Sequence, residues 1–194
     1  FKNTIKSYHK NLAIKSSVNF FNNSLSIDYI NFTPFVSIVI PASGNMFDGK
    51  DLLITLLDSI FKCTNYTNYE IIIIDHDDLN STHTRFIDKY DCVKRIKLNK
   101  IKSKRDFNFS KNCNVAAKHS NGEYLLFLND DMQVINPAWL SKLVGHFSKK
   151  HTGIVGGKLL YPNNNIQHAG VALLNGNPGH LYENQSYDYH DSNI

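Results

Sequence analysis

Cysteine is scarce in this sequence, and its pattern excludes two kinds of scaffold. Cys63, Cys92 and Cys113 are the only cysteines in 194 residues, and they are widely spaced with no Cys-x-x-Cys pair. A disulfide framework calls for an even set of cysteines, and a structural zinc site calls for paired ligands. We therefore expect neither, and we expect a reducing, cytoplasmic location.

Long apolar runs are also missing. No stretch approaches the ~20 apolar residues that cross a bilayer, and the opening FKNTIKSYHK lacks the apolar core of a secretory signal. Hydrophobic residues make up 42% and charged residues 20% of the chain, as in ordinary globular proteins. Because the sequence does not begin with Met, we expect it to be a processed or excised piece of a longer protein.

The net charge of +4 is mild, but the basic residues are unevenly placed. The densest run, VKRIKLNKIKSKR, extends over residues 93–105. It favours a strand with a solvated face followed by a basic loop. A nucleic-acid patch and local attraction for a phosphorylated ligand or an anionic membrane surface are the alternatives. We expect no nucleic-acid partner, and we expect peripheral association with a membrane, at its inner face.

Strand and helix patterns alternate along the chain. Residues 1–33 form a polar arm with room for a short helix, and Pro34 marks a boundary. Continuous apolar runs predict buried strands at 36–40, 71–74 and 124–128, and an alternating run predicts a more exposed strand at 93–98. Helical spacing or helix-start signals predict helices at 52–61, at 81–90 with Ser81 as cap, at 110–119, and from Asn136 to about residue 149. This order predicts an α/β fold with a mainly parallel sheet and helices on both faces.

Polar residues follow three of these strands where each one ends. Pro41 to Ser43 follow the first strand, Asp75 to Asp78 the second, and Asn129 to Asp131 the last. Ligands of such sheets bind beyond the carboxyl ends of the strands. Two acidic strand ends would repel a phosphorylated ligand unless a cation such as Mg²⁺ or Mn²⁺ lies between them. An ordinary polar turn explains the Asp130–Asp131 pair equally well.

Several ordered motifs resemble those of the family 2 glycosyltransferases with the GT-A fold. They are VSIVIP, YEIIIIDHDD, FNFSKNCNVAAKHSNGEYLLFLNDD and GGKLLYPNNNIQHAGV, and the resemblance extends over about residues 36–180. The last motif is similar to a segment of bacterial enzymes that build O-antigen and other surface polysaccharides. The resemblance implies a GT-A domain at 34–180, with a polar tail at 181–194 that starts an acceptor-side segment.

The resemblance also implies roles for particular residues. Asp131 looks like the metal ligand, for Mn²⁺ or Mg²⁺, and Asp130 would contact the ribose or assist with the metal. Asp75 or His76 would read the edge of the base. The other residues implied to line the nucleotide pocket are Pro41, Ala42, Ser43, Asn108, Lys111 and Asn114.

Two departures from the family pattern bear on function. Ala42, Ser43 and Gly44 stand where many members have Thr-Tyr-Asn, so we expect no aromatic platform for the base there. The sequence reaches Ile194 before any Glu-Asp motif that would supply the catalytic base. Glu183, Asp188 and Asp191 do not match that motif, and His168 and His180 are acceptor-side or metal-side candidates.

The sequence therefore supports two functions. The first is an inverting, metal-dependent transfer of sugar from a nucleotide-diphosphate donor to a glycan or lipid-linked acceptor. The second is a truncated GT-A module that binds nucleotide or nucleotide-sugar without turnover. Nucleotidyl transfer to a sugar phosphate is disfavoured because the first strand is not followed by a Gly-rich phosphate loop with a basic residue.

Overall fold

A computed structural model describes residues 2–21, 24–98, 108–174 and 176–187. The chain forms two compact units, Phe1–Gly145 and His146–Ile194, and each is described by itself. No helix within those described ranges is long and apolar enough to cross a membrane.

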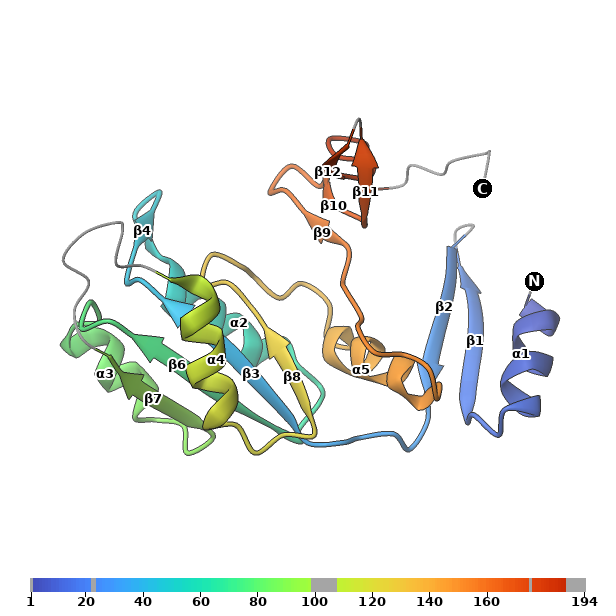
Figure 1. The fold of residues 1–194 in the computed structure, drawn as a ribbon, viewed down its shortest axis with the longest axis horizontal. Helices are drawn as coiled ribbons and strands as arrows, with labels where there is room; N and C mark the ends of the chain where they lie inside the picture. The colour runs from blue at the N-terminus through green and yellow to red at the C-terminus, as the bar shows by residue number, and fades with distance from the viewer. Residues whose placement is uncertain (1, 22–23, 99–107, 175, 188–194) are drawn as a thin grey trace. The chain divides into compact units, whose positions relative to one another are not determined.

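The first unit begins with an N-terminal module. Its elements are α1 (Lys2–Asn11), β1 (Ser16–Phe21) and β2 (Ser24–Tyr29). The two strands pair as an antiparallel hairpin, and α1 lies beside β1 (Figure 1). The short helix was anticipated, whereas the hairpin was not, because Ser and Asn interrupt its apolar residues.

A four-stranded parallel sheet follows, in the order β7-β6-β3-β8. Its elements, with the short hairpin and the helices between them, are β3 (Val36–Ala42), β4 (Met46–Phe47), β5 (Lys50–Asp51), α2 (Leu52–Cys63), β6 (Tyr69–Asp75), α3 (Ser81–Ile87), β7 (Val93–Lys97), α4 (Phe109–Lys118), β8 (Tyr124–Phe127) and α5 (Trp139–Gly145). This confirms the predicted α/β fold with its parallel sheet.

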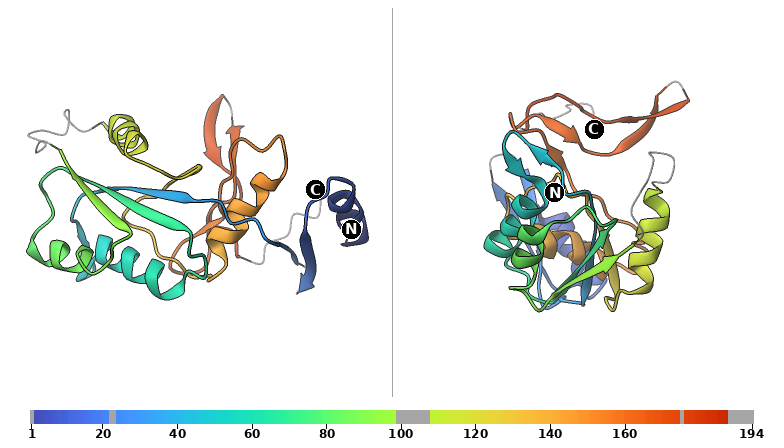
Figure 2. Two further views of the ribbon diagram at one scale, coloured as in Figure 1. Left: turned by 90° about the horizontal axis from the view of Figure 1, so that it is seen from below. Right: turned by 90° about the vertical axis from the view of Figure 1, so that its left-hand side faces the viewer.

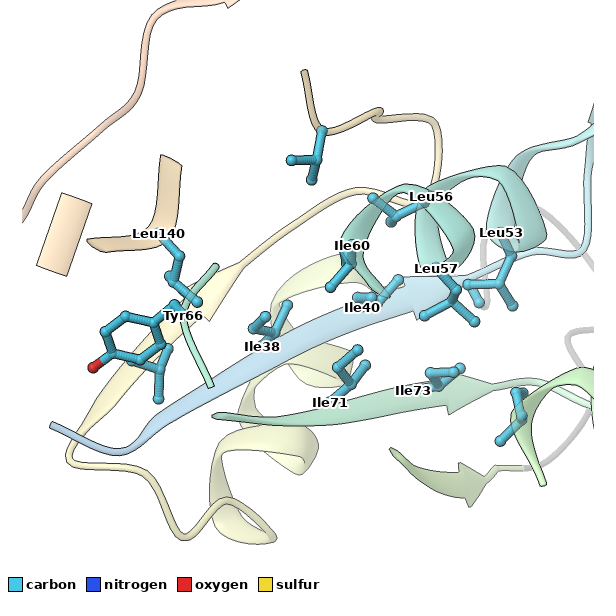
Figure 3. Packing of buried hydrophobic residues seen from close by; sticks show 14 of the residues in the cluster. Ile38, Ile40, Leu53, Leu56, Leu57, Ile60, Tyr66, Ile71, Ile73 and Leu140 are labelled. Carbon is cyan, nitrogen blue, oxygen red and sulfur yellow. The ribbon is translucent and has the colours of Figure 1, made fainter. Parts of the chain in front are cut away.

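Helices cover both faces of the sheet, and strand alternation decides which residues meet which helix. Ile38 and Ile40 of β3 and Ile71 and Ile73 of β6 pack under α2 (Figure 3). Val39, Ile72 and Ile74 point the other way, toward Ala116 of α4. Figure 2 shows α4 on one side of the sheet and α2 and α3 on the other.

The structure corrects three details of the predicted elements. The strand at 124–128 is not fully buried, because it lies at the sheet edge with Leu125 42% and Phe127 49% exposed. Asn80 caps α3 in place of Ser81, since its side chain accepts hydrogen bonds from the next backbone N–H groups. The helix expected from Asn136 to about residue 149 begins at Trp139 and ends at Gly145.

The second unit consists of short elements. They are η2 (His146–Ser148), β9 (Leu159–Leu160), β10 (Ile166–His168), β11 (Val171–Leu174) and β12 (Asn177–His180). β9 pairs with β10 and β11 with β12, both antiparallel. The strands of the first pair lie on either side of the three asparagines at residues 163–165.

Candidate functional site

A cavity of about 280 Å³ opens at the carboxyl edge of the sheet. It lies where the central strand β3 ends beside the loop that follows β8. The residues that line it are Pro41, Ala42, Ser43, Asn45, Phe109, Asn129, Asp130 and Asp131. The structure therefore brings together the strand-end residues that sequence reasoning selected from β3 and from the loop after β8.

Two hydrogen bonds join the walls of this cavity. Asp130 Oδ2 accepts from both the backbone N–H and the side-chain hydroxyl of Ser43, each at 2.9 Å. Hydrogen bonds to a charged acceptor are stronger than those between neutral groups. The Asp130 carboxylate thus fixes the loop after β3 against the loop after β8.

Asp131 is held differently. Its side chain is exposed, and within the described part of the chain its carboxylate forms no hydrogen bond or ion pair. It is therefore available to a ligand in the cavity, while Asp130 keeps one oxygen, Oδ1, outside the bonds to Ser43.

The donor atoms of the cavity fit a hard divalent cation only in part. Carboxylate and amide oxygens are suitable ligands for Mg²⁺ or Mn²⁺. However, no group of three or more His, Cys, Asp or Glu residues in the described ranges is arranged to hold a metal. Mg²⁺ commonly takes one or two carboxylates from the protein and the rest from water and substrate phosphates. The residues present fit a cation that a bound diphosphate helps to coordinate.

Asp75, at the end of β6, is buried, and both of its carboxylate oxygens accept hydrogen bonds from other protein groups. Oδ1 accepts from the backbone N–H groups of Asp78 and Leu79 at 2.9 and 3.2 Å. Oδ2 accepts from Arg95 Nε at 2.9 Å and from Arg95 Nη2 at 2.6 Å. Both oxygens are committed to holding the loop after β6 against β7.

The environment of Asp75 also shifts its ionisation. Burial alone raises the pKa of the carboxyl. The hydrogen bonds from Arg95, Asp78 and Leu79, together with the Arg95 charge, lower it by more, so the pKa lies below its ordinary value. Asp75 is thus a stable carboxylate in a buried ion pair, with two Arg95 nitrogens on one of its oxygens.

His76 is the next residue, and it contacts α4. Its Nε2 lies 3.0 Å from Oδ1 of Asn112, which is buried. An amide oxygen can only accept, so Nε2 carries a proton that it donates. The Asn112 amide nitrogen is buried with no hydrogen-bond partner in the described residues. This His–Asn pair lies between the loop after β6 and the first turns of α4.

The three residues predicted from α4 lie at its start and on its exposed side. Asn108 is the N-cap, and its side chain accepts from Lys111 N at 2.8 Å. Lys111 and Asn114 are exposed and do not line the cavity. Their roles toward a nucleotide stay predictions.

Sequence reasoning missed three residues that shape this region. Phe109 lines the cavity, Asn112 supports His76, and Arg95 neutralises Asp75. The signal for Phe109 was a large apolar residue directly after a helix cap, where burial against the core is not required. Arg95 lies in a strand where charged and apolar residues alternate. The sequence does not show which of these charged residues pairs with Asp75, because that depends on which strand lies beside it.

The structure describes three of the acids and histidines that the sequence suggested near the end of the chain, namely Glu183, His168 and His180. Glu183 accepts a hydrogen bond from the Tyr161 hydroxyl at 2.8 Å. The Nδ1 atoms of His168 and His180 lie 2.8 Å apart, so one ring donates and the other accepts. Asp188, Asp191 and the basic residues after Leu98 up to Arg105 lie outside the described residues.

The parallel sheet with helices on both faces has the fold of the GT-A glycosyltransferases. The mannosyltransferase PcManGT from Pyrobaculum calidifontis, in complex with GDP-Man and Mn²⁺, is similar with a TM-score of 0.52 at 15% identity, over 78% of this chain and 41% of that one. GalNAc-T7 with UDP, GalNAc and Mn²⁺ is similar with a TM-score of 0.53 at 20% identity, over 77% and 30%.

The sequence itself places the chain within a family. Residues 37–192 match the model of glycosyl transferase family 2, and the chain belongs to that family. It is 39% identical over 151 residues to the O-antigen biosynthesis protein RfbC of Myxococcus xanthus, which covers 77% of this chain. It is 35% identical over 161 residues, 81% of this chain, to the uncharacterized protein y4gI of Sinorhizobium fredii (strain NBRC 101917 / NGR234). The chain spans 11% and 17% of the lengths of these two relatives.

Proposed function

We propose that this chain forms the donor-binding part of a metal-dependent glycosyltransferase. It would transfer a sugar from a nucleotide-diphosphate donor to a hydroxyl of a glycan or lipid-linked acceptor, with inversion at the sugar carbon. The cavity carries this proposal, because it places the free Asp131 carboxylate beside Asp130 and the end of β3.

A divalent cation would neutralise charge on the diphosphate as it leaves the sugar. Asp131 would hold that cation, since its carboxylate is exposed to the cavity and has no other partner among the residues that the structure describes. Asp130 would contribute mainly by position, because one of its oxygens already accepts two hydrogen bonds from Ser43.

The nucleoside would lie between the end of β3 and the start of α4. Asp75 has both oxygens bonded inside the protein, so His76 is the residue that we propose for the edge of the base. Phe109 would supply the aromatic surface that Ala42 to Gly44 lack, because its ring is in the cavity lining and 45% exposed. Aromatic rings stack on any base, so this contact would add affinity without selecting the base.

The name of one relative supports polysaccharide as the product. RfbC is described as an O-antigen biosynthesis protein, and O-antigen is a polysaccharide. The two structural neighbours were solved with Mn²⁺ and with GDP-Man or UDP. We therefore propose polysaccharide synthesis on the cytoplasmic side of a membrane, with Mn²⁺ or Mg²⁺ as the cation.

Calorimetric titration tests the donor site. UDP, GDP and dTDP would each be titrated into the chain with and without Mn²⁺, and into Asp131→Ala and Asp88→Ala. Asp88 is a matched control, because it is an exposed carboxylate at the end of α3. We expect one nucleotide to bind only with Mn²⁺, with affinity lost in Asp131→Ala and kept in Asp88→Ala.

Two outcomes would change the assignment. Equal binding by Asp131→Ala and the unaltered chain would remove Asp131 from the site. Metal-dependent binding without any hydrolysis or transfer of the sugar-nucleotide would favour a module that binds nucleotide-sugar without turnover.

A further inference from the structure

A second cavity, of about 400 Å³, lies in the N-terminal module. It is lined by Lys6, His9, Lys10, Ile14, Lys15, Ser16 and Ile30. These residues come from α1, from the turn after it, and from the two ends of the hairpin. None of them lines the cavity at the sheet edge, so the two cavities share no residue.

Buried polar contacts give this cavity a fixed wall. His9 is 2% exposed, and its Nδ1 lies 2.6 Å from the Ser16 hydroxyl, which joins α1 to β1. Two backbone hydrogen bonds hold the segment between α1 and β1 in place. Ile14 N donates to His9 O at 2.9 Å, and Ile30 N donates to Lys15 O at 2.8 Å. The backbone that bears Lys6, Lys10 and Lys15 is therefore fixed by hydrogen bonds.

The module carries a net positive charge. Residues 1–33 contain four lysines and one acid, Asp28, so their net charge is 4 − 1 = +3. Lys2, Lys6 and Lys10 recur every four residues, which places them on one side of α1. Within the described ranges Lys6, Lys10 and Lys15 form no ion pair, so their charges are left for a ligand.

Apolar side chains accompany these cations. Ile14 and Ile30 line the cavity, and Leu12 and Ile30 are 50% and 47% exposed. Free phosphate and nucleic-acid backbone offer nothing apolar for such residues to contact at the phosphate. An anionic lipid offers a phosphate for the lysines and an apolar region for the isoleucine and leucine side chains, because its phosphate lies directly above acyl chains.

We propose that the N-terminal module binds the phosphate of anionic lipid at a membrane surface. Lys6, Lys10 and Lys15 would contact the phosphate, and Leu12 and Ile30 would enter the boundary between headgroups and acyl chains. This inference deepens the proposed function, because it assigns the contact with a membrane that carries a lipid-linked acceptor to one surface of the chain.

The module is also joined to the sheet domain. β2 packs against α5, where Lys142 Nζ donates to the Ser26 hydroxyl at 3.0 Å. Gly145 leaves room for the Tyr29 ring, because a Cβ built at this glycine would lie 2.0 Å from that ring. A membrane contact made by the module would therefore hold the sheet domain near the same surface.

Vesicle co-sedimentation tests this proposal on the full chain. The vesicles would contain phosphatidylcholine alone, or phosphatidylcholine mixed with phosphatidylglycerol. We expect binding only to the mixed vesicles, and weaker binding as salt is raised. Each lysine near an anionic surface contributes about fivefold, so a Lys6→Gln/Lys10→Gln/Lys15→Gln variant should lose on the order of a hundredfold in affinity.

The controls keep the result interpretable. Lys62→Gln/Lys89→Gln/Lys118→Gln removes three exposed lysines outside the module and should bind the mixed vesicles nearly as well as the unaltered chain. Both triple variants should keep their circular dichroism spectra, and both should bind nucleotide with Mn²⁺ as the unaltered chain does. Failure of the donor site would therefore be seen separately from failure of the lipid site.

Three results would overturn the proposal. The first is equal loss of vesicle binding in the two triple variants, which would mean a diffuse charge effect. The second is equal binding to both kinds of vesicle. The third is competition by glycerol phosphate or by a short DNA duplex at the affinity of the vesicles, which would assign the cavity to free phosphate or to nucleic acid.

Discussion

At the scale of single residues, three aspartates near the sheet edge differ in what surrounds them. Asp75 is buried against Arg95, Asp130 accepts two hydrogen bonds from Ser43, and Asp131 is exposed. The sequence places all three after strands but cannot reveal their partners, because Ser43 and Asp130 are 87 residues apart. The parallel pairing of the strands brings Arg95 to Asp75 and Ser43 to Asp130, and it leaves the Asp131 carboxylate without such a partner among the described residues.

Phe109 gives the first prediction at this scale. Phe109→Leu keeps an apolar side chain but removes the ring, so nucleotide binding should weaken by about 1–3 kcal/mol, the usual contribution of base stacking. Phe109→Tyr keeps the ring and should bind nearly as well as the unaltered chain. Calorimetry with the preferred nucleotide and Mn²⁺ measures both, and equal affinity for the Leu and Tyr variants would mean that no base stacks there.

Arg95 gives the second prediction. Arg95→Met leaves the buried Asp75 charge unpaired and should lower the free energy of unfolding by about 3–5 kcal/mol. Lys62→Met removes an exposed partner of Asp58 and should leave the free energy of unfolding nearly unchanged. Urea unfolding at neutral pH measures both variants.

The same pair sets the pH dependence. The pKa of Asp75 is lowered in the folded protein, so its stabilisation is present above the unfolded value of about 4 and is lost as pH falls through the folded pKa. The difference between Arg95→Met and the unaltered chain should therefore shrink in acid. A difference that stays constant down to the acid transition would contradict an ionic origin.

At the scale of elements, strands that are buried on two faces could be predicted and the hairpin could not. The run Ile71 to Ile74 is apolar at every position, because β6 has helices on both faces. β1 and β2 mix Ser, Asn and Asp with their apolar residues, so neither stands out from the surrounding polar arm. β8 was predicted as a strand, but its place at the edge depends on pairing that one sequence does not display.

The cap of α3 offers a prediction at this scale. Asn80 accepts from the N–H groups of Thr82 and His83, and His83 Nδ1 accepts from Asn80 N. Asn80→Ala should lower the free energy of unfolding by about 1 kcal/mol, the usual value of an N-cap. Ser81→Ala, one residue along, should have almost no effect. The reverse order in urea unfolding would restore Ser81 as the cap.

At the scale of the whole molecule, the cavity at the sheet edge and the cavity of the N-terminal module are lined by different residues, and we propose donor binding for the first and lipid binding for the second. The fold class and the sheet edge at which the first cavity lies followed from the order of strands and helices. The lining by Phe109 and the cavity of the N-terminal module did not follow, because each depends on side chains that meet only after the chain has folded.

Linked binding supplies the prediction for the whole molecule. Nucleotide with Mn²⁺ at about one hundred times its dissociation constant should stabilise the chain by about 2.7 kcal/mol. For this chain length the midpoint of thermal unfolding should rise by roughly 5–10 °C. Asp131→Asn should unfold at the same temperature as the unaltered chain without ligand and show no such rise with ligand. A lower midpoint for Asp131→Asn alone would indicate a structural role.

The hydrogen bonds between Ser43 and Asp130 have a consequence for how the site is assembled in time. They join residues 87 positions apart, and the segment between them contains β4, β5, α2, β6, α3, β7, α4 and β8. Contacts so distant along the chain form late, because the entropy of closing the loop must be offset by the structure within it. The helices α2, α3 and α4 and the pairing of β6 with β3 and β7 can therefore be in place while the cavity is still unformed. Recovery of nucleotide binding after refolding would lag behind recovery of helical signal, and it would measure the final step of folding.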